Sequence, residues 1–89
     1  MDRANFKAAL EGDGYEEITT TTTLHERHNP EHTHDYDVRG MVLQGSFTLT
    51  MDGRTTTLRP GDIYTMFRDC RHSESCEREG VVTLSGRKY

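Results

Sequence analysis

The sequence has few of the residues that usually build a protein interior. Its 89 residues include no tryptophan, two prolines and two cysteines, and the mean hydropathy is -0.86. Leucine, isoleucine, valine and phenylalanine together number 15 of 89, a share below the ~20% under which disorder becomes an alternative. Disordered chains usually also carry a high net charge, whereas this chain carries only -4. We therefore expect one small domain whose thin core needs a metal ion, a second subunit or both.

The same absences exclude several classes of protein. No apolar run approaches the ~20 residues of a membrane-spanning helix, and a pI near 5.7 without a basic stripe argues against nucleic acid as the main partner. Two cysteines, Cys70 and Cys76, are too few for a disulfide scaffold. The first ten residues include Asp2, Arg3 and Lys7 instead of the apolar stretch of a signal peptide. We expect a cytoplasmic protein with free thiols.

Local patterns predict one short helix followed only by strands. The helix is predicted over about residues 2–11 with Asp2 as its N-cap. Asp52-Gly53 is the strongest hairpin signal, because a type I′ turn needs positive φ at both central residues. We expect Gly45 to end one strand and Glu79-Gly80 to form a turn. The predicted strands are residues 15–24, 38–44, 46–51, 54–59, 63–67, 73–78 and 81–85. Short strands with frequent turns predict a single all-β sandwich or barrel domain over residues 1–89.

Four of the five histidines lie between residues 25 and 34. Side chains at positions i and i+2 of a strand point to the same face, so His32 and His34 can reach one metal ion together. His72 is the only histidine available from a distant segment. Imidazole binds Fe, Ni, Cu and Zn, so the ligand type does not select the ion. An isolated His-x-His pair is more often simply solvated, and the surrounding spacing has to decide between the two interpretations.

In the spacing of its histidines and glycines, the chain resembles the cupin family. The family's first motif is H-x-H-x(3,4)-E-x(6)-G and its second is G-x(5)-P-x-G-x(2)-H-x(3)-N. The residues that match them are His32, His34, Gly45, Gly61 and His72. The resemblance covers about residues 15–87 and implies a cupin-type double-stranded β-helix, or jelly roll. It also implies that the three histidines hold a divalent metal ion inside the barrel, namely Fe, Mn, Ni or Zn.

Several motif positions carry other residues. Val38 stands where the glutamate of the first motif would be. In the second motif, Phe67 replaces the proline, Asp69 the glycine and Cys76 the asparagine. The four-ligand set of three histidines and one glutamate is therefore not intact.

Three interpretations of the ligand set follow. The ion is held by the three histidines alone, or a carboxylate joins them, or the site has lost its metal. The carboxylate would come from Asp37 through a β-bulge, since strand alternation otherwise turns it away, or from Glu74. Glu74 lies two residues after His72, so its side chain should share that strand face and enter the barrel.

The resemblance implies dioxygenases, isomerases and lyases that act on small oxygenated metabolites. Glu74 and Tyr36 are the candidate catalytic residues, because Tyr36 shares the parity of His34 and could donate a hydrogen bond. A non-catalytic module that binds or senses a small molecule, and a purely structural metal, are the alternatives. A small-molecule ligand and a homodimer are the expected partners, and neither nucleic acid nor membrane is expected. We expect Cys76 to be an inert inward residue, whereas a reactive Cys70 would need a lowered pKa.

Overall fold

Six antiparallel strands and one short helix make up the protein in this computed structural model, which describes residues 1–89. The all-β class with a short N-terminal helix is confirmed. The elements are α1 (Arg3–Gly12), β1 (Glu16–Thr23), β2 (Arg27–His32), β3 (Asp37–Met51), β4 (Arg54–Leu58), β5 (Ile63–Met66) and β6 (His72–Lys88). No helix is long and apolar enough to cross a membrane.

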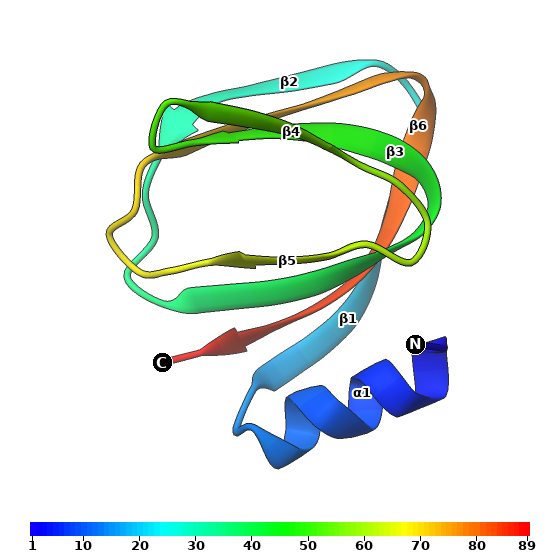
Figure 1. Ribbon diagram of the computed structural model, residues 1–89, viewed down its shortest axis with the longest axis vertical. Helices are drawn as coiled ribbons and strands as arrows, with labels where there is room; N and C mark the ends of the chain where they lie inside the picture. The colour runs from blue at the N-terminus through cyan, green and yellow to red at the C-terminus, as the bar shows by residue number, and fades with distance from the viewer.

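The strands form two layers that face each other, because β3 and β6 are long enough to run through both (Figure 1). In one layer, β2 pairs with the first half of β6, which pairs with the second half of β3, which pairs with β4. In the other layer, β1 pairs with the second half of β6, which pairs with the first half of β3, which pairs with β5. This is the jelly-roll arrangement that the family resemblance implies.

Both long strands bend at a glycine as they pass from one layer to the other. Gly45 and Gly80 have φ of 74° and 77°, a region that glycine enters at little cost. Another backbone also lies close at each bend, since a Cβ on Gly45 would meet the Gly80 carbonyl and a Cβ on Gly80 would meet the Thr23 carbonyl. The prediction that the chain breaks at these two points was wrong, because each strand bends there and continues pairing. Residues of β2 were also not predicted as a strand.

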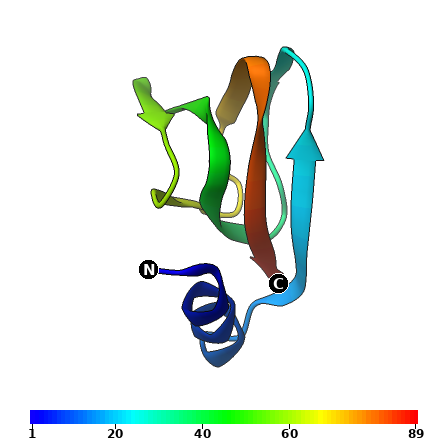
Figure 2. The ribbon, with the colours of Figure 1, turned by 90° about the vertical axis from the view of Figure 1, so that its right-hand side faces the viewer.

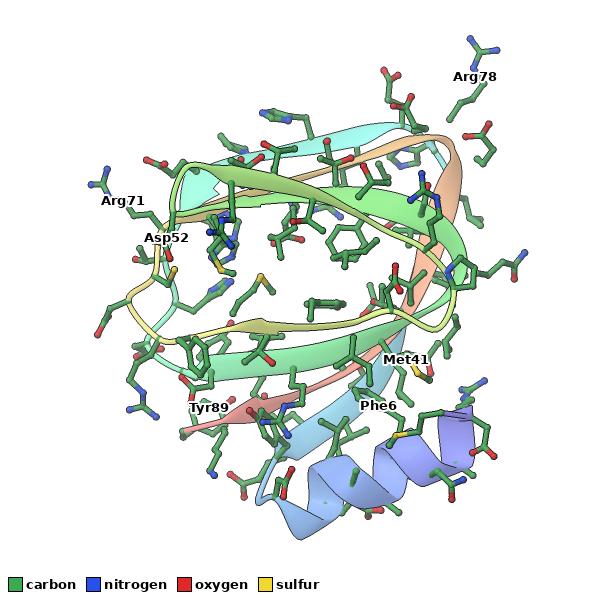
Figure 3. The ribbon with its side chains drawn as sticks, viewed as in Figure 1. Phe6, Met41, Asp52, Arg71, Arg78 and Tyr89 are labelled. Atoms are coloured by element: carbon green, nitrogen blue, oxygen red, sulfur yellow. The ribbon has the colours of Figure 1, made fainter.

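Two separate hydrophobic clusters stabilise the fold, one on each side of the layer that contains β1. Along β3 the side chains alternate, so that Val42 points into the barrel and Met41 points out toward α1. Phe6 and Leu10 of α1 pack on this outer face. Figure 2 shows the position of the helix, and Figure 3 shows Phe6 on the side of the helix that faces Met41. Inside the barrel the buried cluster comprises Val38, Val42, Phe47, Leu49, Leu58, Met66 and Cys76. The first part of β3 is thus buried against the barrel interior on one face and against the helix on the other.

Two local predictions about turns and caps are confirmed. Asp2 caps α1 by accepting a hydrogen bond from the backbone N–H of Asn5 at 2.8 Å. Asp52 and Gly53 have φ of 53° and 74°, as a type I′ hairpin between β3 and β4 requires. Only 16 of 89 residues are buried, so the expected thin core is present and small losses of packing will matter.

Gly80→Ala should lower the free energy of unfolding by about 2 kcal/mol or more, since it adds backbone strain to a close approach between the new Cβ and the Thr23 carbonyl. Urea denaturation followed by circular dichroism measures this loss. Gly61→Ala is the matched control, because Gly61 also has a positive φ, of 92°, but has nothing within 4 Å of an added Cβ. Equal losses in the two variants would contradict the close approach at Gly80.

Candidate metal centre

Three histidines from two distant parts of the chain meet at one end of the barrel. His32 is the last residue of β2, His34 lies in the loop that follows, and His72 is the first residue of β6. Their ring centroids lie 4.3 to 5.1 Å apart, and their ligand nitrogens all lie within 4.8 Å of one another. The structure thus brings together the three residues that the motifs single out. His34 is not part of a strand, however, so strand alternation is not what directs its side chain.

The loop between β5 and β6 holds His34 in place. The backbone N–H of Asp69 donates to the His34 carbonyl at 2.8 Å. Asp69 has a φ of 63°, so it adopts the left-handed conformation that aspartate tolerates better than most residues. An aspartate at the position of the motif glycine is therefore compatible with this loop.

Backbone carbonyls orient two of the imidazoles. Nδ1 of His72 lies 3.0 Å from the Cys70 carbonyl, and Nδ1 of His32 lies 2.7 Å from the Pro30 carbonyl. A carbonyl can only accept, so in each ring Nδ1 carries the proton and Nε2 presents a lone pair. Metal-binding histidines are usually fixed by this kind of hydrogen bond. The geometry therefore prepares both Nε2 atoms to act as ligands.

One of these nitrogens forms no hydrogen bond within the protein. His72 is only 1% exposed, and its Nε2 is buried without a hydrogen bond. Leaving such an atom unsatisfied costs about 1–3 kcal/mol. A cation bound by the three imidazoles would satisfy it. The donor set thus fits a divalent ion of the kind that imidazole binds.

A carboxylate lies beside the histidines, and it belongs to Glu74. Its Oε1 lies 3.5 Å from Nε2 of His72 and 3.6 Å from Nε2 of His32. Two ligands of one ion, each about 2.1 Å from it, lie at most about 4.2 Å apart. Both distances are within that limit. The separations among the histidine nitrogens reach 4.8 Å, slightly more than this limit. A small side-chain rotation would therefore bring all three nitrogens within reach of one ion.

The other candidate carboxylate points elsewhere. Asp37 accepts a hydrogen bond from the backbone N–H of Arg68 at 2.8 Å, and Nε of Arg68 lies 3.7 Å away. Val38, which occupies the position of the motif glutamate, packs in the inner hydrophobic cluster. Of the two alternatives left open by the sequence, the structure places Glu74 and not Asp37 next to the histidines.

Tyr36 packs against the centre. Its ring stacks on the His34 imidazole with centroids 4.8 Å apart and an angle of 15°, and the Arg87 guanidinium lies 4.6 Å from the Tyr36 ring. Burial lowers the pKa of His34, and the neighbouring His32, His72 and Arg87 lower it further against the opposing effect of Asp35. His34 therefore favours the neutral form that binds metal.

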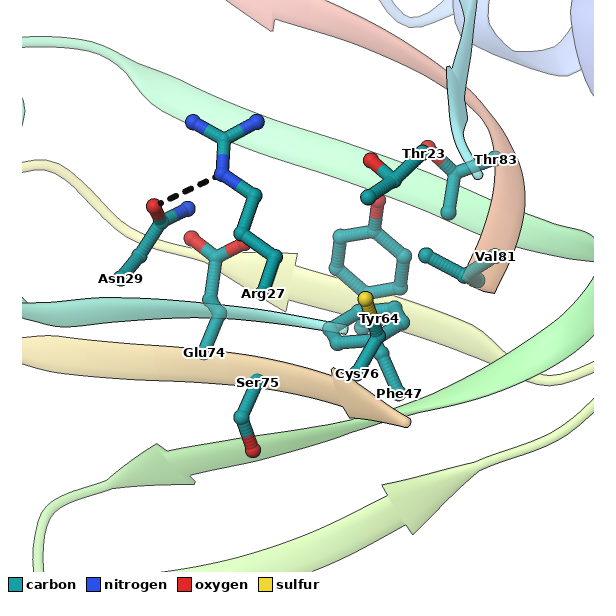
Figure 4. A pocket seen from close by; sticks show the side chains of 10 residues that line it. All are labelled: Thr23, Arg27, Asn29, Phe47, Tyr64, Glu74, Ser75, Cys76, Val81 and Thr83. Carbon is teal, nitrogen blue, oxygen red and sulfur yellow. Dashed lines mark hydrogen bonds between the residues drawn. The ribbon is translucent and has the colours of Figure 1, made fainter. Parts of the chain in front are cut away.

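Two cavities open into the barrel and share Tyr64 and Glu74 in their walls. The larger, of about 470 Å³, also contains His34, Tyr36 and Arg87. The smaller, of about 120 Å³, extends toward Arg27 (Figure 4). Burial raises the pKa of Tyr64 to about 12, so its phenol stays protonated and can only donate or accept a hydrogen bond near neutral pH.

Sequence reasoning missed three of these polar residues, namely Arg27, Tyr64 and Arg87. Tyr64 lies on a predicted strand, where its parity relative to Met66 could have placed it inside. Arg27 gave no such signal because β2 was not predicted.

Neither cysteine thiol takes part in the centre. Cys76 is buried, and its thiol donates to the His25 carbonyl at 3.3 Å. Burial and the neighbouring Asp52 carboxylate both raise the pKa of Cys70, which is the opposite of what a reactive thiol needs. His25 and His28 are exposed.

Comparison with known proteins decides the family. The model of the cupin domain matches residues 20–87, which is most of the chain. The protein is a cupin. Both halves of the cupin signature, at His32 and at His72, lie within the matched residues. A comparison of this cupin with curated proteins finds no match.

Solved structures similar to this cupin are longer proteins. KdgF from Halomonas sp. is 22% identical with a TM-score of 0.66, and the match covers 79% of this chain and 66% of KdgF. DMSP lyase DddQ from Ruegeria pomeroyi DSS-3 is 18% identical with a TM-score of 0.70, over 79% and 36% of the chains. An HTH_3 family transcriptional regulator from Vibrio cholerae is 24% identical with a TM-score of 0.66, over 88% and 45%. The cupin thus spans between about a third and two thirds of these proteins, which share its fold.

Replacing His72 with alanine should abolish metal retention, because it removes the buried ligand that the Cys70 carbonyl orients. Metal content of protein purified without chelator, measured by plasma mass spectrometry, checks this. His28→Ala is the control, since His28 is exposed and lies outside the cluster. Circular dichroism verifies that both variants fold. Unchanged metal stoichiometry in folded His72→Ala protein would refute the assignment.

Proposed function

We propose that this cupin is a metal-dependent enzyme that acts on a small oxygenated metabolite. Its divalent ion would be held by His32, His34 and His72. The observation that carries the proposal is the buried Nε2 of His72, which forms no hydrogen bond and lies within 4.8 Å of the ligand nitrogens of the other two imidazoles. The ion would supply a Lewis acid for a substrate oxygen or, if it is iron, a centre for dioxygen chemistry.

The residues around the histidines would supply the remaining functions. Glu74 can take up or release a proton at its carboxylate, which lies in the walls of both cavities. Tyr64 is a neutral hydrogen-bond donor in the same walls. Tyr36 positions His34 by stacking and lines the larger cavity, where it can contact a bound molecule. Phe47 and Val81 give the smaller cavity an apolar side that limits access of water.

Two other roles compete with catalysis. The similar structures include a DMSP lyase and a transcriptional regulator, so this fold serves both chemistry and regulation in other proteins. A non-catalytic binding module is therefore one alternative, and a purely structural ion is the other. The carboxylate of Glu74 beside the histidines, and a cavity that His34 and Glu74 both line, favour catalysis.

Cobalt(II)-substituted protein tests whether the ion has an open coordination position. We expect the visible absorption spectrum to change on addition of azide, because three imidazoles leave positions free for an external ligand. The His72→Ala variant, treated in the same way, is the control for cobalt bound elsewhere. A spectrum that does not respond to azide would contradict the proposed enzyme and favour a structural ion.

Glu74→Gln should weaken metal binding by about tenfold or more, since it removes a negative charge 3.5–3.6 Å from two ligand nitrogens. Competition with a chromogenic chelator measures the dissociation constant. Asp37→Asn is the matched control and should change it little, because the Asp37 carboxylate binds Arg68 instead. A larger effect of Asp37→Asn would show that Asp37 and not Glu74 serves the site. The same order of effects is expected for activity.

A further inference from the structure

A second polar group lies at the rim of the smaller cavity, apart from the three histidines, and includes the exposed Arg27 and the half-buried Asn29. Arg27 and Asn29 occupy alternate positions on β2, so their side chains lie on the same face. Across the ladder to β6, Arg27 is opposite Cys76 and Asn29 is opposite Glu74. All four residues contribute to the wall of the smaller cavity (Figure 4).

The guanidinium of Arg27 is held in position but has no acidic partner. Its Nε donates to Oδ1 of Asn29 at 3.2 Å, and no carboxylate oxygen lies within 4.0 Å of it. Arg87, the other arginine that lines a cavity, is 3.4 Å from Glu17 and stacks on Tyr36. Arg27 therefore keeps its two terminal nitrogens available, and Figure 4 shows them directed away from Asn29.

The cavity beside Arg27 suits a small polar molecule. Its volume of about 120 Å³ corresponds to roughly four water molecules at ~30 Å³ each, so a ligand there has only a few non-hydrogen atoms. Thr23, Thr83 and Tyr64 supply hydroxyl groups to the wall. Arg27 is the one cation among these lining residues, and Glu74, shared with the larger cavity, lies between Arg27 and the histidines.

We propose that the smaller cavity binds the carboxylate of a small organic acid, with the Arg27 guanidinium as its partner and Asn29 as the residue that orients it. A guanidinium presents parallel N–H groups that match a carboxylate in a bidentate pair. The rest of the molecule would extend past Glu74 toward the histidines. This inference rests on the proposed function, because it assumes that the substrate binds inside the barrel. It narrows the substrate class to hydroxy or oxo acids.

Lactate and its neutral analogue lactamide are suitable probes, because they have the same shape and differ in charge. Titration of zinc-loaded, ¹⁵N-labelled protein followed by NMR gives both dissociation constants. We expect lactate to bind more tightly than lactamide. Arg27→Met should weaken lactate binding by about tenfold or more and leave lactamide unchanged, since a charge-assisted hydrogen bond is lost. Arg78→Met is the control, because Arg78 lines neither cavity and points away from the barrel (Figure 3).

The outcomes separate this inference from the proposed function. The titration is repeated on protein stripped of metal with a chelator. A loss of lactate affinity on Arg27→Met that persists without metal supports the carboxylate site, even if the histidines prove not to hold an ion. Lactate binding that is lost when the metal is removed, and is unchanged in the Arg27→Met variant, would overturn the proposed carboxylate site. Equal affinity for lactate and lactamide, or no binding of lactate at millimolar concentration, would also overturn it.

Discussion

The antiparallel ladder between β3 and β6 is the interaction on which the rest of the structure depends. It runs from Asp37 opposite Lys88 to Met51 opposite His72 and passes through both layers. Every other strand pairs with one of these two. Because both strands bend together where Gly45 lies next to Val81, one ladder forms two facing layers with a space between them. The polar residues of that space are placed by the register of this ladder.

The register also explains why the donors converge. Residues 72, 74 and 76 of β6 share a face, so His72, Glu74 and Cys76 all point into the barrel. β2 then lies along the same stretch of β6 and brings His32 opposite His72. The imidazoles thus lie at the end of the barrel, beyond the apolar cluster. Two backbone carbonyls, those of Pro30 and Cys70, direct the protons of two rings away from the centre. A set of lone pairs facing one point is the consequence.

Much of the fold and of the histidine cluster could be predicted from the sequence, because both depend on local spacing. Asp52-Gly53 fixes a hairpin by its own conformational preference, and the alternation of Phe47 and Leu49 fixes which face is buried. The bends at Gly45 and Gly80 could not be predicted, because a glycine with positive φ can either end a strand or bend it. Pairing with the neighbouring strand determines which of these two outcomes occurs. Arg27 could not be found at all, since its position depends on the pairing of β2 with β6. The choice between Asp37 and Glu74 likewise depended on the Arg68 backbone, which lies 31 residues away from Asp37 along the chain.

Because the core is thin and the interior is polar, we expect bound metal to stabilise this fold. The homodimer stays a prediction. The melting temperature of chelator-treated protein with and without added divalent metal tests this most directly. Saturation at about a hundredfold over the dissociation constant contributes ~2.7 kcal/mol, which corresponds to a rise of roughly 10–20 °C for a domain of this size. We predict a rise of that order with at least one of Fe, Mn, Ni or Zn. A melting temperature that no divalent metal changes would contradict the account.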